Sequence, residues 1–98
     1  MNLLQETVDI LSQHSKTIFD IEWFGDFDCE YNCDLQKLIN FDYDDGYGIS
    51  EVPAGFVLVG ADFWLERHEY DGSEWWEYKE LPKRPMNKRQ PEKLIEFR

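Results

Sequence analysis

The sequence predicts an α+β domain, in which an N-terminal amphipathic helix packs on a mainly antiparallel sheet of about four to five strands. Apolar residues repeat with a helical period near the N-terminus, and polar and apolar residues alternate in several later segments. Two of those segments flank Asp71-Gly72, the strongest short signal for a β-hairpin. At 98 residues the chain has the length of one domain with one core.

The first element is a helix over residues 3–15. Leu4, Val8 and Leu11 follow one another at i, i+4 and i+7, with a second apolar row beside them formed by Leu3, Thr7 and Ile10. Asn2 is the expected N-cap, with Gln5 as its capping-box partner three residues on. The apolar stripe is expected to face the core.

Residues 17–31 change to an alternating pattern, which predicts two half-buried strands separated at Gly25. In the second of these, Asp26, Asp28 and Glu30 alternate with apolar residues. Asp34 is then expected to cap a short helix that turns Leu35, Leu38 and Ile39 inward. A loop rich in Asp, Tyr and Gly follows over residues 41–48, with Asp44-Asp45-Gly46 as its turn.

Three further strands are expected at residues 56–60, 62–70 and 73–81. Two hairpin registers remain open. A two-residue turn places Glu66 opposite Glu77 and Glu69 opposite Glu74, which is repulsive and would require an external cation or partner. A four-residue turn pairs Glu66 with Lys79 instead; turn statistics favour the first register and local electrostatics the second. Arg67 is expected to stack on Trp76 or Tyr78, depending on the register.

The net charge of −11 is unevenly distributed. Residues 1–81 carry 19 acidic and four basic side chains, hence −15, and residues 82–98 carry two acidic and six basic side chains, hence +4. We therefore expect a single acidic α+β domain over 1–81 and a basic C-terminal tail over 82–98, set apart by Pro82, Pro85 and Pro91. The apolar residues Leu94, Ile95 and Phe97 favour a docked last turn in that tail.

Charge this concentrated destabilises the compact state by self-repulsion, so we interpret the acidic face as a surface for a basic partner. On a strand, Asp26, Asp28 and Glu30 would form a carboxylate row with a spacing of about 6.6 Å. Adjacent Trp75 and Trp76 must point to opposite faces of their strand, so one of them can be an exposed anchor. The candidate partner-binding residues are Asp26, Asp28, Glu30, Asp42, Asp44, Asp45, Glu66, Glu69, Glu74, Glu77 and Trp75.

The sequence does not indicate catalysis. Cys29 and Cys33 could ligate a metal together with His68, but no further Cys or His pair completes a common zinc site, and the interpretation we favour is two small apolar residues. Asp26 begins a calcium-loop-like run that lacks the Gly and the Glu of an EF-hand, and the Asp-rich loop offers only adventitious cation binding. We expect no enzyme activity, no cofactor and no metal.

The composition also limits the classes of partner that the chain can bind. Direct binding of nucleic acid is disfavoured by the acidity, and the longest apolar run, residues 56–59, is too short to span a membrane. The N-terminus lacks the features of a secretory signal, so a cytoplasmic location is expected.

In size, acidity and aromatic content the chain resembles small phage-encoded inhibitors of host defence, such as anti-CRISPR proteins and other DNA mimics. The resemblance implies a non-catalytic inhibitor whose Asp and Glu side chains occlude the basic surface of a nucleic-acid-binding protein in a competitive, salt-sensitive manner. The alternative is a small self-associating assembly protein, in which the basic tail of one chain, residues 82–98, docks on the acidic body of another.

Overall fold

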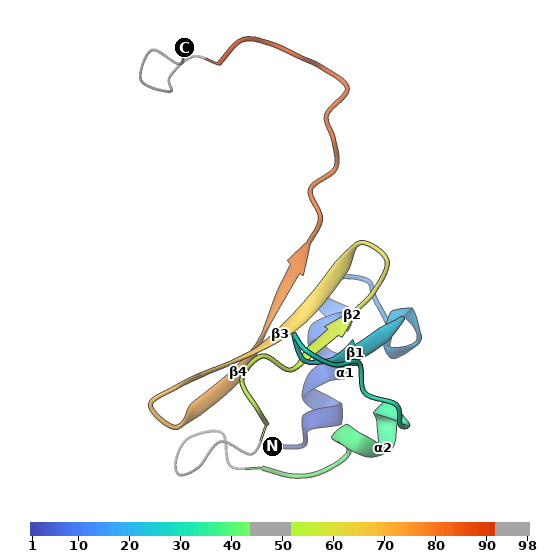
Figure 1. The fold of residues 1–98 in the computed structure, drawn as a ribbon, viewed down its shortest axis with the longest axis vertical. Coiled ribbons are helices and arrows are strands. Elements are labelled where there is room, and N and C mark those ends of the chain that lie inside the picture. Colours follow the sequence, from blue (N-terminus) through green and yellow to red (C-terminus); the bar gives the residue numbers. More distant parts are fainter. Residues whose placement is uncertain (44–51, 92–98) are drawn as a thin grey trace.

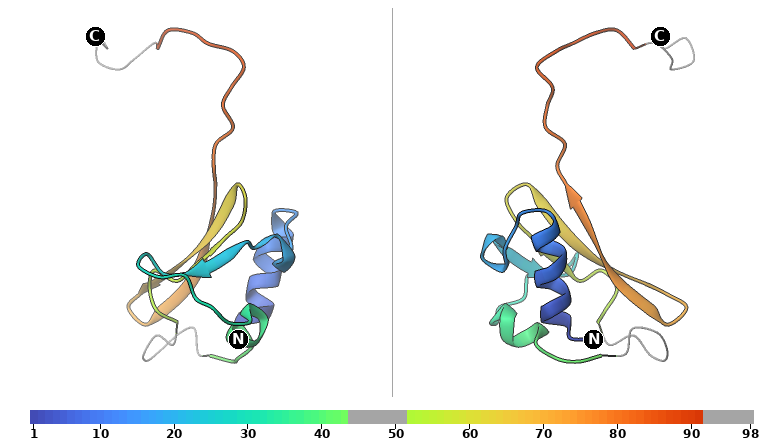
Figure 2. Two further views of the ribbon diagram at one scale, coloured as in Figure 1. Left: turned by 45° about the vertical axis from the view of Figure 1, so that its right-hand side comes forward. Right: turned by 180° about the vertical axis from the view of Figure 1, so that it is seen from behind.

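The computed structural model describes residues 1–43 and 52–91 and shows an α+β fold (Figure 1). Strands β1 (Trp23–Gly25), β2 (Val57–Val59), β3 (Phe63–Tyr70) and β4 (Ser73–Glu80) form one antiparallel sheet in the order β1-β2-β3-β4. Helix α1 (Leu3–Gln13) lies against one face of this sheet (Figure 2). The predicted fold class is confirmed.

Helix α1 begins as the sequence predicts, because the Asn2 side chain accepts a hydrogen bond of 2.9 Å from the amide of Gln5. It ends at Gln13, two residues early, before Ser15 takes a φ of 60°. The buried row is Leu3, Thr7 and Leu11, whereas Val8 is 37 % exposed. The helix is therefore turned toward the second of the two predicted rows.

The first predicted strand after α1 is partly wrong, since residues Ile18–Asp20 form a 3-10 turn, η1. The Thr17 hydroxyl accepts from the amide of Phe19 at 3.2 Å, and the Asp20 carboxylate accepts from the amide of Thr17 at 2.8 Å. Such local side-chain bonds compete with strand pairing. The strand is thus reduced to β1.

The second predicted strand, residues 26–31, is instead a tight turn that folds back onto β1. Asp26 accepts a bond of 2.8 Å from the amide of Asp28, and the amide of Asp26 donates to the carbonyl of Cys29 at 2.9 Å. The carboxylate row expected from a strand is therefore absent there. Helix α2 (Leu35–Ile39) forms where predicted, with the Asp34 side chain accepting from two backbone amides and Ile39 buried. Leu38, also predicted to face inward, is 40 % exposed.

The β3–β4 hairpin adopts the register of a two-residue turn, with Glu66 opposite Glu77 and Glu69 opposite Glu74. Asp71 and Gly72 have φ values of 53° and 84°, the paired positive angles of a type I′ turn. Phe63, Leu65 and Trp76 lie on the side facing α1 and join Leu3, Leu11 and Leu58 in the core. We call this side of the hairpin its inner face.

Residues 82–91 leave the end of β4 without regular secondary structure, are exposed throughout and run away from the sheet (Figure 1). The docked last turn expected near Leu94 and the turn expected at Asp44-Asp45-Gly46 lie outside the described residues. None of the helices in residues 1–43 and 52–91 has the length and apolar content of a membrane span.

Candidate protein-binding surface

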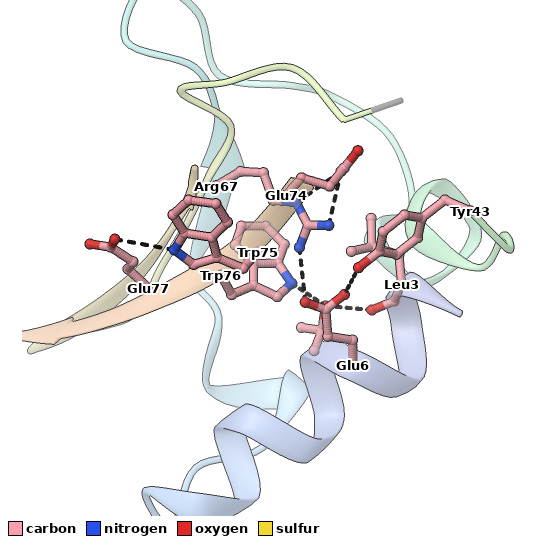
Figure 3. Close-up of polar contacts among 9 residues, drawn as sticks. Leu3, Glu6, Tyr43, Arg67, Glu74, Trp75, Trp76 and Glu77 are labelled. Carbon is pink, nitrogen blue, oxygen red and sulfur yellow. Dashed lines mark hydrogen bonds and ion pairs between the residues drawn. The ribbon is translucent and has the colours of Figure 1, made fainter. Parts of the chain in front are cut away.

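The inner face of the hairpin holds a buried ionic network centred on Arg67 (Figure 3). Arg67 is 2 % exposed; its Nε and Nη2 donate to Glu74 Oε1 at 3.1 and 2.9 Å, and its Nη1 donates to Glu6 Oε2 at 3.1 Å. The guanidinium also lies 5.1 Å from the ring centroids of Tyr43 and Trp76, so the predicted stacking partner in this register is Trp76.

Further hydrogen bonds tie the same region to α1. The hydroxyl of Tyr43 donates to Glu6, and burial together with this bond raises the pKa of Tyr43 to about 12. The buried Trp76 Nε1 donates to Thr7 Oγ1 at 2.9 Å, and the Thr7 hydroxyl donates to the Leu3 carbonyl at 2.7 Å. This network holds the hairpin on α1, so its role is structural.

We call the other side of the sheet the outer face, and its residues include Trp23, Val59, Trp64, Glu66, His68, Trp75, Glu77 and Lys79. It repeats one contact twice: the indole N–H of Trp64 donates to Glu66 Oε1 at 2.7 Å, and that of Trp75 donates to Glu77 Oε2 at 3.2 Å. Each tryptophan ring is therefore held in position by a glutamate two residues further along the strand.

The opposed glutamates of this face are bridged by other side chains of the same hairpin. Lys79 Nζ lies 3.1 Å from Glu66 Oε2, and His68 Nε2 lies 3.0 Å from Glu66 Oε2 and 3.4 Å from Glu77 Oε1. The hydrogen bond from Trp64, followed by those from His68 and Lys79, lowers the pKa of Glu66 to about 2. The expectation that this register needs an external cation is thus corrected, since Lys79 of the same hairpin pairs with Glu66 and Arg67 pairs with Glu74 on the inner face.

Strand pairing extends the outer face across the sheet. Trp23 pairs with Val59, Val59 with Trp64, and Trp64 with Lys79, so one row crosses all four strands. Trp23 and Trp75 are 36 % and 37 % exposed. Exposed tryptophans on a sheet surface are typical anchors of protein interfaces.

A second candidate surface is the acidic turn, residues 26–30. Its carboxylate Asp26 is committed to the turn itself: the amide of Asp28 lowers the pKa of Asp26, and the hydroxyl of Tyr31 donates to it at 3.1 Å. Gly25 allows the turn to close, because a Cβ there would lie 2.2 Å from the carbonyl oxygen of Cys29. Asp28 and Glu30 are exposed beside Phe27, which is 81 % exposed.

The charges around this turn have no ion-pair partner among the residues that the structure describes. Three of the four basic residues of the body form ion pairs elsewhere: Lys16 with Asp62 at 3.4 Å, Arg67 on the inner face and Lys79 on the outer face. Within residues 1–43 and 52–91, no cation lies at ion-pair distance from the acidic residues of the segment 20–34, namely Asp20, Glu22, Asp26, Asp28, Glu30 and Asp34. This segment is therefore a negative surface whose carboxylates form no ion pair within the described residues.

The predicted partner-binding residues thus divide into groups. Glu66, Trp75 and Glu77 share the outer face, while Glu74 is buried against Arg67. Glu69 is exposed near the hairpin turn, and Asp42 is exposed beside Asn2. Asp26, Asp28 and Glu30 meet in the acidic turn, and Asp44 and Asp45 lie outside the described residues.

Sequence reasoning missed Trp23, Trp64 and His68 as members of the outer face, and Phe27 at the turn. The signal available for Trp64 and His68 was their even spacing from Glu66, which places them on one side of a strand. Trp23 could be added only once the pairing of β1 with β2 was known.

Two further features of the described residues are an apolar pocket and the two cysteines. An apolar pocket of about 230 Å³ opens between α1, α2 and residues 52–56, and its described lining contains no acid, base or metal ligand. Cys29 and Cys33 are both exposed, and the described residues contain no group of three or more His, Cys, Asp or Glu that could hold a metal ion. Comparison with protein-family models, with curated protein sequences and with solved structures finds no match for this chain.

Proposed function

We propose that this chain is a non-catalytic inhibitor that binds a basic, nucleic-acid-binding protein and covers the surface on which nucleic acid would bind. The observation that carries the proposal is the exposed acidic segment 20–34, whose carboxylates have no ion-pair partner in the described part of the chain. The resemblance to anti-CRISPR proteins and other DNA mimics in size, acidity and aromatic content supports the same class of partner.

The physical basis is charge complementarity between the acidic turn and a lysine- or arginine-rich partner. Unpaired carboxylates gain most from such a partner, because they exchange mutual repulsion for attraction and accelerate the encounter. The hydrogen bonds of Asp26 and the tight closure at Gly25 fix the turn before binding. Little conformational entropy is then lost when the complex forms.

Two substitutions in the turn test the proposal. Asp28→Lys with Glu30→Lys reverses two exposed charges and leaves the turn-forming Asp26 in place. Immobilised wild-type and variant chains are used to capture partners, and binding of each identified nucleic-acid-binding protein is then measured at low and high salt. We expect capture of a basic protein, loss of about tenfold or more in affinity in the variant, and competition with that protein's nucleic acid.

The matched control is Asp9→Lys with Glu80→Lys, which makes the same change in net charge on α1 and at the end of β4. Equal weakening in the control would show that only total charge matters and would remove the turn from the interface. Unchanged binding in the turn variant would also remove it, and a captured protein that binds together with its nucleic acid would contradict the inhibitory mechanism.

A further inference from the structure

We propose that the basic tail of one chain binds the outer face of a second copy of the same chain. The contacting segments would be residues 82–88 of the tail and the outer face around Trp75. This self-association goes beyond the proposed function, since it is centred on Trp75 and requires no foreign partner, although Trp23 at the edge of the outer face adjoins the acidic turn.

The chemistry of the tail is that of an extended basic ligand. Pro82-Lys83-Arg84-Pro85 has the P-x-x-P spacing of segments that adopt the polyproline II conformation, and proline also restricts the residue before it to extended geometry. Lys83, Arg84 and Lys88 are exposed, and Met86 is 97 % exposed. This segment therefore presents cationic and apolar side chains that the body of its own chain does not cover.

The outer face has the chemistry that recognises such a segment. Polyproline II ligands dock on surfaces lined with aromatic rings, and tryptophan is also the best ring for stacking an arginine. Trp75 is 37 % exposed and His68 stacks beside it, with ring centroids 6.2 Å apart. Glu77, with its side chain 39 % exposed, stands next to these rings as an acceptor for Lys83 or Arg84.

The extended length of residues 82–88 also matches the dimensions of the outer face. A polyproline II segment rises about 3.1 Å per residue, so residues 82–88 extend for roughly 20 Å. Four strands spaced about 4.8 Å apart span roughly 15 Å from the first to the last. Trp75 also lies four residues, about 13 Å, along β4 from the row that contains Trp23, so the diagonal between the two tryptophans is roughly 20 Å. One extended tail can therefore just reach both Trp75 and Trp23.

The choice of a second copy follows from the path of the tail and from the charges. Residues 82–91 run away from their own sheet (Figures 1 and 2), so the outer face of the same chain is left open. The tail carries +4 and the body −15, which favours contact between chains. Mutual exchange of tails gives a closed dimer in which each contact is formed twice.

Sedimentation of the full chain over a range of concentrations tests the proposal. We expect a reversible dimer at low salt that dissociates on dilution and at high salt. Two variants should each raise the concentration needed for half-dimerisation by about tenfold or more: Lys83→Glu with Arg84→Glu in the tail, and Trp75→Thr on the outer face. Circular dichroism and thermal unfolding establish that both variants fold.

Mixing the two variants gives the sharpest result. The tail variant retains an intact outer face, and the Trp75→Thr chain retains an intact tail, so we expect the mixture to associate more strongly than either variant alone. A wild-type chain that stays monomeric at low salt would overturn the proposal, as would a dimer that both variants leave unchanged. A monomer whose tryptophan fluorescence changes on Lys83→Glu would place the tail on its own chain and would equally overturn it.

The proposed function is tested separately by the same materials. The Asp28→Lys, Glu30→Lys chain keeps its tail and outer face, so we expect it to dimerise while losing the basic partner. Loss of dimerisation in that chain would show that the acidic turn, and not the outer face, receives the tail.

Discussion

The two faces of the β3–β4 hairpin both contain a pair of opposed glutamates, one in buried and one in exposed surroundings. Each face places two glutamates directly opposite one another, Glu69 and Glu74 on the inner face and Glu66 and Glu77 on the outer face. On the inner face, the fully buried guanidinium of Arg67 binds Glu74 and Glu6. On the outer face, Glu66 instead lies next to the exposed Lys79 ammonium and to the His68 ring, which also contacts Glu77. We therefore expect the ion pairs of the buried inner face to contribute much more to stability than those of the outer face.

The largest effect is expected on the inner face. Arg67→Met removes the cation and leaves the buried Glu74 carboxylate without its guanidinium, which costs about 3–5 kcal/mol in comparable buried pairs. We expect urea denaturation to show a loss of that size in the free energy of unfolding.

The double variant Arg67→Met with Glu74→Leu is the informative companion. Replacing both members of a buried pair with apolar residues is often close to neutral, so much of the stability should return. A double variant as unstable as Arg67→Met alone would show that Glu74 is not the group that the arginine neutralises.

Next in size is the link between the inner face and α1. Thr7→Val keeps the side-chain volume but leaves the buried Trp76 Nε1 without its acceptor, at a cost of about 1–3 kcal/mol. Thr7→Ser retains the hydroxyl and serves as the control in the same denaturation experiment. A loss in Thr7→Ser with none in Thr7→Val would point to the methyl group instead.

On the outer face the pH dependence isolates Glu66. Its pKa is lowered from 4.5 to about 2, so its stabilising contribution is complete above pH 4.5 and disappears as the pH falls from 4.5 through 2. With partial exposure taken into account, we expect this contribution to be about 1–2 kcal/mol. Unfolding free energies of wild type and Glu66→Gln should converge across that range; parallel curves would contradict the assignment.

The smallest effect is expected for Lys79→Ala. Its ion pair with Glu66 is exposed, with the lysine side chain 43 % accessible, and exposed pairs contribute less than about 1 kcal/mol. High salt should remove most of the difference between wild type and variant. A loss as large as that of Arg67→Met would abolish the contrast between the two faces.

These contrasts show which parts of the structure local sequence could predict. Asn2 and Asp34 are caps whose bonds depend on residues at most three positions away, and both helices begin where expected. The Asp71-Gly72 turn was equally local. The register stayed open because counting only directly opposed residues omits Arg67, which reaches Glu74 diagonally.

The predictions that were wrong or incomplete also have physical causes in particular contacts. Alternation in residues 26–31 predicted a strand, but Asp26 bonds the amide of Asp28 and converts the pattern into a turn. The outer face required the pairing of β1 with β2, which brings Trp23 into line with Trp64 through Val59. Neither the contact of Arg67 with the Tyr43 ring nor its bond to Glu6, 61 residues away, could be predicted from spacing.

The two-residue turn at Asp71-Gly72 sets the parity of the hairpin. Inserting one residue into β4 just after this turn would reverse the side on which every later residue of the strand emerges. Trp76 would then leave the core and Trp75 would enter it, although no residue of either strand had been replaced. The hairpin should accordingly tolerate many exchanges on its outer face during sequence divergence, but very few changes in length.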